Sequence, residues 1–321
     1  MALSLGACKN KNLNPTFNLV FAGTVNGEPL ECGRIYEEIG QSKSSIEVRD
    51  VRFYVHDIEF IQADGSVTPL TLKKDDEFQL SYTKPDGTEG GLALVDFTNT
   101  DSEMCSLRGT KTIHTTVSGR APQAEYTAVR FKVGVPQELN HVDGSVSAPP
   151  LNAYGMQWTW TSGYRHMKID VKATTNDKTK EAYYFHPGAQ GCESTTGTVK
   201  GPYKCTMNFA PELELELNPE TQAVELDLAR FYAQDDLNRG RGCMFVRNIP
   251  DMQDGPNPGA AAGLANGCDE MFAAVGLALP DETMEPNAAM STVTQTAFRT
   301  IDWSEDVGPD VSRARVSELD P

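Results

Sequence analysis

The stretch that decides the fold spans residues 46–61 and reads IEVRDVRFYVHDIEFI. Apolar and polar residues alternate along it, and many of its residues are β-branched or aromatic. A period of two is typical of a β-strand, because successive side chains of a strand point to opposite faces. The run ends at Ala63-Asp64-Gly65, which predicts a turn, and residues 67–72 would return. The sequence therefore predicts a long strand and its reversal here.

Shorter segments with strand character occur along most of the chain, at residues 16–21, 91–97, 126–135, 157–171, 213–217 and 223–228. The last two flank Asn218-Pro219-Glu220-Thr221, whose Asn and Pro are turn residues, so a hairpin is predicted there. Strands and helices do not alternate regularly, which argues against a parallel α/β fold. Many short strands separated by turns favour a mainly β protein, an antiparallel β-sandwich.

The composition divides the chain into four parts. Residues 1–14 resemble a trimmed signal and tether, and residues 15–235 carry the strands of the sandwich. From residue 238 the sequence becomes rich in Gly, Pro, Ala and Asn, as in GPNPGAAAGLANG. We therefore expect residues 236–303 to form a loop-rich, disulfide-stapled C-terminal extension packed on the sandwich, with a short helix at 269–279. The charged residues 304–321 are expected to be a disordered tail.

Charge and missing motifs exclude several functions. The 321 residues carry a formal net charge of −17, which argues against nucleic-acid binding, because phosphate contacts need clustered Lys and Arg. No run of 18 apolar residues occurs, so no membrane-spanning helix is expected. The motifs GxSxG, HExxH, the Walker loop and GxGxxG are all missing from the sequence. We therefore expect a protein that is not an enzyme.

Seven cysteines lie at positions 8, 32, 105, 192, 205, 243 and 268, and no two form a CxxC motif. Their scattered spacing is typical of disulfides in an oxidising compartment. Six cysteines can pair in roughly 15 ways. Proximity in sequence favours Cys192–Cys205 and Cys243–Cys268, which leaves Cys32–Cys105. The alternative is that they are reduced, buried side chains.

The remaining cysteine, Cys8, follows Leu5-Gly6-Ala7, and this tetrapeptide resembles a bacterial lipobox. The polar residues after it, KNKNLNP, have the character of a tether. We therefore expect a secreted protein of the periplasm or outer-membrane surface, with Cys8 as a lipid-attachment site.

One segment, MQWTWTSGYRH at residues 156–166, contains two of the three tryptophans. In a strand, Met156, Trp158 and Trp160 would lie on one face, since side chains at i, i+2 and i+4 share a side. Packing in the core is the simpler interpretation. A metal site that includes an aromatic residue is the sharper one, because imidazole and thioether groups can bind transition metals. His141 and His186 come from other loops, which converge at one end of a rigid sandwich.

Four motifs taken together resemble the MbnP-like family, the four-cysteine half of the metallo-mystery pair. They are RFYV at 52–55, GVPQELNH at 134–141, MQWTWTSGY at 156–164 and HPGAQGC at 186–192. The resemblance extends from about residue 17 to about residue 279. Two departures occur: the family's HLGS reads His186-Pro187-Gly188-Ala189 here, and His166 replaces the aromatic residue usually found two positions after Gly-Tyr.

The resemblance implies a periplasmic copper-binding protein encoded beside a di-haem enzyme of the MauG and cytochrome c peroxidase type. That partner oxidises a tryptophan to kynurenine, which helps to form the copper site. The aryl amine of kynurenine can donate a lone pair, whereas an indole N–H only donates a hydrogen bond. The candidate metal-site residues are His141, His186, Trp158, Trp160 and, less centrally, Met156. His56 and His114 lie on predicted strands and are taken as structural.

A second interpretation remains open. A disulfide-stapled sandwich with exposed aromatic side chains could instead be a metal-free module that binds a carbohydrate or another protein. That function predicts intact Trp158 and Trp160 and no bound copper.

Overall fold

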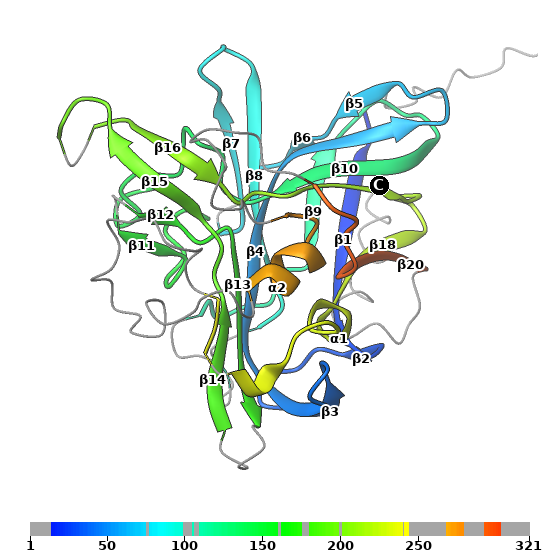
Figure 1. Ribbon diagram of the computed structural model, residues 1–321. Coiled ribbons are helices and arrows are strands. Elements are labelled where there is room, and N and C mark those ends of the chain that lie inside the picture. The colour runs from blue at the N-terminus through cyan, green and yellow to red at the C-terminus, as the bar shows by residue number, and fades with distance from the viewer. Residues whose placement is uncertain are drawn as a thin grey trace, which may run out of the picture.

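The strand predicted at residues 46–61 is β4 (Ser44–Gln62), and it lies inside the larger of two packed sheets (Figure 1). Its antiparallel neighbours are β10 (Tyr126–Val133) and β13 (Met167–Thr174). This computed structural model describes residues 14–74, 77–98, 105, 109–159, 162–174, 180–198, 201–239, 241–243, 268–278 and 292–302. The predicted parts 1–14 and 304–321 therefore lie almost wholly outside the described residues, as do Cys8 and Trp160.

Within those residues the larger sheet has ten strands, and its main path runs β17-β10-β4-β13-β14-β19. Three further strands pair with β4, and β7 pairs with β8. The remaining strands of this sheet are β3 (Ile35–Ile39), β5 (Val67–Pro69), β7 (Gln79–Thr83), β8 (Glu89–Asp96), β14 (Lys180–Phe185), β17 (Glu212–Glu216) and β19 (Arg241–Cys243).

The second sheet has six strands in the described part of the chain and runs β20-β18-β1-β9-β6, with β2 paired to β1. These strands are β1 (Thr16–Val25), β2 (Glu28–Pro29), β6 (Thr71–Leu72), β9 (Thr116–Arg120), β18 (Gln222–Asp227) and β20 (Phe298–Asp302). The short helix α1 (Leu228–Phe231) follows β18, and Asp227 caps it by accepting a hydrogen bond from the amide of Ala229 at 2.9 Å. A 3-10 turn, η1 (Leu237–Arg239), and α2 (Cys268–Ala274) complete the helices of the described residues.

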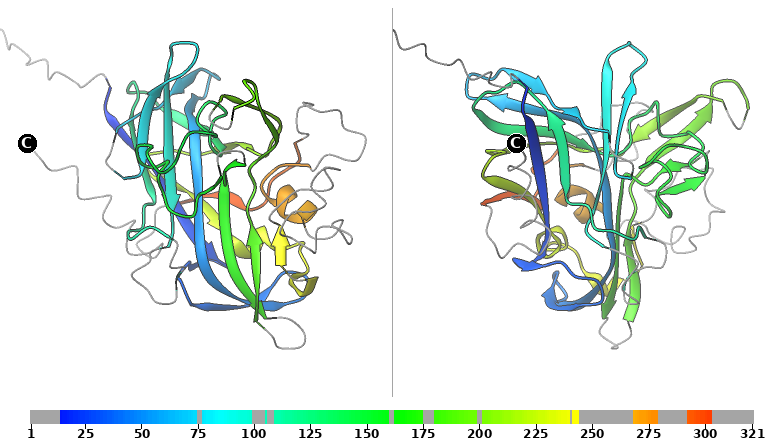
Figure 2. Two further views of the ribbon diagram at one scale, coloured as in Figure 1. Left: turned by 90° about the vertical axis from the view of Figure 1, so that its left-hand side faces the viewer. Right: turned by 180° about the vertical axis from the view of Figure 1, so that it is seen from behind.

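Two small sheets lie on the other side of the larger sheet, away from β1 and β18, as the three views agree (Figures 1 and 2). One pairs β11 (Gln157–Thr159) with β12 (Gly163–Tyr164), and the other pairs β15 (Ala189–Ser194) with β16 (Tyr203–Asn208). Together with the loop of residues 134–156 and the short paired segments 165–166 and 186–188, they form an outer layer on the larger sheet. We refer to it below as the outer layer, and to the opposite side of the larger sheet as its inner face.

The main core lies between the inner face and the sheet of β1. Phe21 of β1 meets Phe53 of β4 and Phe131 of β10 edge to face, with ring centroids 5.7 Å apart in both pairs. A second, smaller apolar cluster lies under the outer layer and includes Tyr54 and Tyr164. The larger sheet is therefore buried on both faces.

Three features differ from the sequence prediction. Strands β17 and β18 do not form a hairpin: the turn after Asn218 is present, but β17 pairs with β10 and β18 pairs with β1 in the other sheet. Two pairs, β1 with β18 and β14 with β19, are parallel. Two described segments from 236–303, β19 and β20, are strands of the two sheets rather than loops lying on them. The helix expected at 269–279 is present as the shorter α2.

Two of the three expected disulfides are present, Cys32–Cys105 and Cys192–Cys205. Cys243 is also disulfide-bonded, and β19, which it ends, contacts α2, which begins at Cys268. In the described part of the chain, neither the length nor the apolar character of any helix would suffice to cross a membrane.

Candidate metal centre

Trp158 lies between the hairpin that carries it and the segment after β14. Its ring is half-buried. The guanidinium carbon of Arg165 lies 4.9 Å from the ring centroid, which is a cation–π contact. A Cβ at Gly188 would come within 2.8 Å of the same ring, so glycine allows the indole to lie against the backbone there. Arg165 also forms a β-bridge with Gly188. The fold thus brings the tryptophan hairpin against the segment that begins with His186.

His186 follows directly on the last residue of β14 and is 6% exposed. Its Nε2 lies 2.5 Å from Oδ1 of Asp170, a residue of β13. Its Nδ1 is buried and makes no hydrogen bond within the described residues. Burial lowers the pKa of His186 below its ordinary range, although the hydrogen bond to Asp170 opposes this. The imidazole is therefore neutral at neutral pH, the form in which histidine binds metals.

His141 lies beside the disulfide of β15 and β16. Its Nε2 is 3.1 Å from Sγ of Cys205, and its ring stacks on Tyr203 with centroids 4.4 Å apart. The side-chain nitrogen of Asn140 lies 3.2 Å from the same Nε2. The side-chain oxygen of Asn140 accepts a hydrogen bond from the backbone N–H of Tyr164. His141 also lines a cavity of about 680 Å³ at the surface. The loop histidine is thus fixed against both small sheets.

His141, Cys192 and Cys205 form the one group of three or more His, Cys, Asp or Glu side chains whose ligand atoms lie within 4.8 Å in the described part of the chain. Both sulfurs belong to a disulfide, so neither is a thiolate able to bind a metal. His186 is not in this group. The two candidate histidines therefore lie in the same outer layer without forming a preassembled cluster of that kind.

Known proteins are similar to this chain over a region that includes the outer layer. The family model described as MbnP matches residues 14–245, which covers β1 to β19 and every described candidate for the metal site. The chain belongs to the MbnP family. A solved structure, MbnP from Methylosinus trichosporium, is similar over 91% of this chain and 99% of that one, with 25% identity and a TM-score of 0.70. The comparison with curated proteins finds no significant match.

Contrary to the sequence prediction, Met156 does not lie on a strand with Trp158. It lies just before β11 rather than in it, and it is fully buried in the apolar cluster with Leu151 and Tyr164. Its carbonyl accepts a hydrogen bond from the amide of Arg165 at 2.7 Å. Met156 and Trp158 therefore do not share one strand face, and the environment of Met156 is that of a core residue. Trp160 lies outside the described residues.

Two other histidines, His166 and His114, have structural surroundings. His166 is fully buried; its Nδ1 accepts a hydrogen bond from the Val135 amide at 2.9 Å, and its Nε2 lies 2.6 Å from the Asn208 side-chain oxygen. Burial lowers its pKa to about 4. His114 stacks on Phe78 and its Nδ1 lies 2.9 Å from the carbonyl oxygen of Leu94. With both nitrogens engaged, His166 ties loops of the outer layer together.

Sequence reasoning missed the charged residues that surround His186. Asp50 and Arg52 of β4 and Lys168 of β13 are buried charged residues in otherwise apolar strands, and Asp170 of β13 is half-buried beside them. Arg52 belongs to the RFYV motif, but its partner was not foreseen. The available signal was the recurrence of a charge at every second position of two strands that are apolar on their other face, since a buried charge needs a partner.

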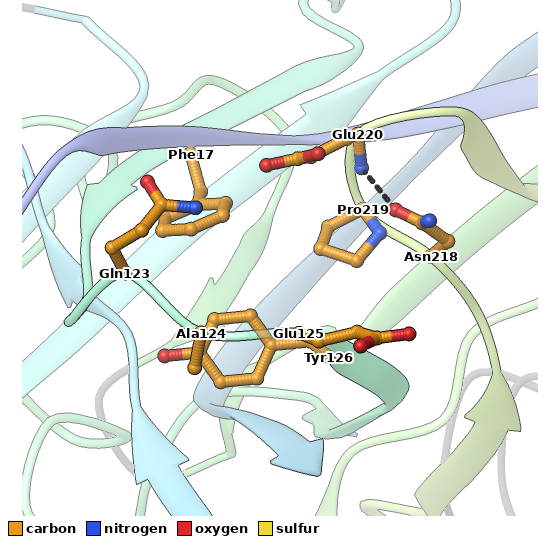
Figure 3. A pocket seen from close by; sticks show the side chains of 8 residues that line it. All are labelled: Phe17, Gln123, Ala124, Glu125, Tyr126, Asn218, Pro219 and Glu220. Atoms are coloured by element: carbon orange, nitrogen blue, oxygen red, sulfur yellow. Dashed lines mark hydrogen bonds between the residues drawn. The ribbon is translucent and has the colours of Figure 1, made fainter. Parts of the chain in front are cut away.

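A separate cavity of about 210 Å³ lies near the start of β1 and the turn between β17 and β18 (Figure 3). Phe17 and Tyr126 supply aromatic walls, and Glu220 donates its amide to the Asn218 side chain at 2.9 Å. None of its lining residues is a histidine, cysteine or methionine. Its chemistry does not fit a soft metal ion.

Proposed function

We propose that this MbnP-family chain binds copper in the periplasm or at the outer-membrane surface and acts in copper homeostasis. His141, His186 and a tryptophan oxidised to kynurenine, Trp158 or Trp160, would hold the ion. A di-haem enzyme of the MauG and cytochrome c peroxidase type would carry out the oxidation, so the chain itself would not be a catalyst. Cys8 would carry a lipid anchor.

The single observation that carries this proposal is the buried Nδ1 of His186, which lacks a hydrogen-bond partner among the described residues. A buried polar atom without a partner is costly, and native proteins keep few of them. A neutral imidazole with a lone pair is a good donor to copper. His186 lies two residues before Gly188, which packs on the Trp158 ring, and this proximity in the chain supports a site shared by the two segments.

His141 supports the proposal by its position. Its imidazole is half-buried, borders a surface cavity, and is held by Asn140 and the Cys192–Cys205 hairpin. A ligand that packs against a disulfide-bonded hairpin keeps its place without the metal, so binding costs less ordering. Met156 contributes packing rather than a thioether, because its side chain lies in the apolar cluster.

The test is peptide mass spectrometry on protein isolated from its native host, with metal analysis of the same sample. Loss of one carbon and gain of one oxygen on Trp158 or Trp160, together with bound copper, would support the proposal and identify the residue. Trp303 provides the internal control, because it should remain intact. Intact Trp158 and Trp160 without copper would instead favour the metal-free binding module. Copper with intact tryptophans would leave a site built on the histidines.

A further inference from the structure

Four charged residues form a connected group on the outer face of the larger sheet. In the antiparallel pair of β4 and β13, Lys168 is opposite Arg52 and Asp170 is opposite Asp50. Residues opposite each other in a pair share a face of the sheet. The intervening residues, Val51 and Ile169, pack in the main core. The charges therefore lie side by side under the outer layer.

Contacts join these residues into a chain of alternating sign that ends at His186. The Nε and Nη2 atoms of Arg52 each lie 2.7 Å from one carboxylate oxygen of Asp50. Lys168 pairs with Asp50 and, at 2.9 Å, with Oδ2 of Asp170. The other oxygen of Asp170 faces Nε2 of His186. Arg52, Asp50, Lys168 and Asp170 thus fix one another and the imidazole.

The chemistry of the two groups determines which atom carries the proton in the contact between Asp170 and His186. Oδ2 of Asp170 pairs with the ammonium of Lys168 at 2.9 Å, while Oδ1 lies 2.5 Å from Nε2 of His186. An aspartate paired with a lysine is a carboxylate, which only accepts hydrogen bonds. The proton between it and His186 must be on Nε2. A neutral imidazole with its proton on Nε2 has its lone pair on Nδ1, the atom that is buried without a hydrogen bond.

A purely structural histidine has a different pattern. In His166 of the same layer, one nitrogen accepts from the Val135 amide and the other meets the Asn208 side chain, so neither lone pair nor proton is left over. His186 uses one nitrogen only within the described residues. Histidines that bind metals through one nitrogen usually donate the other N–H to a carboxylate or carbonyl, which sets the tautomer and the ring orientation.

We propose that Asp170 is a positioning residue that fixes the Nε2–H tautomer of His186, so that Nδ1 is the copper-binding atom, and that Lys168, Asp50 and Arg52 hold Asp170 in place. This inference rests on the proposed copper site and specifies one ligand atom and its supporting residues. Arg52 adds a second connection, because its Nη1 donates at 3.0 Å to the carbonyl of Tyr154, just before the tryptophan hairpin. The connected group of four charged residues thereby orients both His186 and the segment that leads to Trp158.

The test is two-bond ¹H–¹⁵N NMR of the histidine rings in ¹⁵N-labelled protein from the native host, before and after addition of Cu(I). Metal-free protein should show His186 protonated at Nε2 and unprotonated at Nδ1. Cu(I) should shift the Nδ1 resonance and leave the Nε2 proton in place. This measurement needs no variant, so it decides the inference even where a substitution prevents folding.

The variant to compare is Asp170→Asn, in which the amide can donate to Nε2 and favour the wrong tautomer. We expect a mixed or reversed tautomer in the metal-free protein and a roughly 10- to 100-fold lower Cu(I) affinity. Asp57→Asn is the control, because Asp57 also contacts a histidine, His56 at 3.2 Å, and two lysines, Lys84 at 2.6 Å and Lys132 at 3.4 Å. This control should retain the wild-type affinity and the His186 tautomer.

The outcomes separate the two proposals. If wild-type protein binds no copper, the proposed function fails, and the inference fails with it. If copper binds but the Nδ1 resonance does not move, or Nδ1 proves to carry the proton, only the inference is overturned. Equal affinities of the Asp170→Asn and Asp57→Asn variants would also overturn it.

Discussion

The two faces of β4 are equally buried, but they are buried in different ways. On the inner face, Val51 and Phe53 pack against apolar side chains of the other sheet. On the outer face, Asp50 and Arg52 meet charged partners, and the Tyr54 hydroxyl donates to the carbonyl of Pro150 at 2.9 Å. Apolar packing depends on volume and shape, whereas each buried polar atom requires a particular partner. The inner face therefore stabilises the fold, and the outer face determines where the site residues lie.

Truncation on the inner face should have the largest effect on stability. Phe53 contacts Phe21, Phe97 and Phe298 with ring centroids 5.7 to 6.0 Å apart. Phe53→Ala should lower the free energy of unfolding by about 3–5 kcal/mol, since it removes apolar contacts and leaves a cavity. The protein that remains folded should bind copper as before. Chemical denaturation and a Cu(I) competition titration measure the two quantities, and a loss of affinity in the folded variant would break the contrast between the faces.

A substitution on the outer face should lower both the free energy of unfolding and the Cu(I) affinity. Arg52→Met preserves most of the side-chain volume but leaves Asp50 with Lys168 as its remaining cationic partner. We expect a loss of about 3 kcal/mol in the free energy of unfolding, because the buried carboxylate of Asp50 loses one of its two cationic partners. Copper affinity should fall as well, since the Tyr154 contact is lost with the guanidinium. The same titrations check this, and unchanged affinity would show that Arg52 acts on stability alone.

The pH dependence of stability should report on the outer layer through His166. Its pKa of about 4 in the folded protein is lower than the ordinary value of about 6.5, so the unfolded chain binds more protons between these values. The stabilisation is complete above about pH 6.5 and is lost as the pH falls through about 4, with a total of about 3 kcal/mol. His166→Asn should flatten this part of the curve. Denaturation of both proteins at pH 7 and pH 4.5 isolates the contribution, since the carboxylates titrate in both. An equally steep curve in the variant would contradict it.

A smaller effect is expected where the two outer segments touch. In Gly188→Ala the new Cβ would approach the Trp158 ring and the carbonyl oxygen of Tyr164 within 2.8 Å. Relief of that overlap should cost about 1–3 kcal/mol of stability and displace the indole. Tryptophan fluorescence and thermal unfolding would detect the change. An unaltered fluorescence spectrum and an unaltered unfolding temperature would contradict close packing of Gly188 on Trp158.

Sequence periodicity predicted the strands well and their partners poorly. The alternation in residues 46–61 gave β4, and the motif of 156–164 led to β11 and β12. Alternation does not reveal which strand lies alongside, so the turn after Asn218 was taken for a hairpin although it joins two different sheets. The parallel pairing of β1 with β18 joins residues about two hundred positions apart, which local pattern cannot predict.

The candidate site shows the same limit. Residue type and motif selected His141, His186 and Trp158 as candidates, and all three lie in the outer layer. The role of Asp170 could not be found that way, because it depends on the β4–β13 register and on the fold of the segment after β14. Met156 was assigned a strand position from its spacing, whereas a turn before β11 directs it into the apolar cluster.

Whether His186 binds the copper can be tested by comparing Cu(I) binding of His186→Ala and His56→Ala in one competition assay. Both substitutions remove a buried histidine next to an aspartate on the larger sheet. The outer-layer site predicts that His186→Ala loses copper binding, while His56→Ala retains the wild-type stoichiometry and affinity. Equal copper binding by the two folded variants would contradict the assignment of His186 to the metal centre.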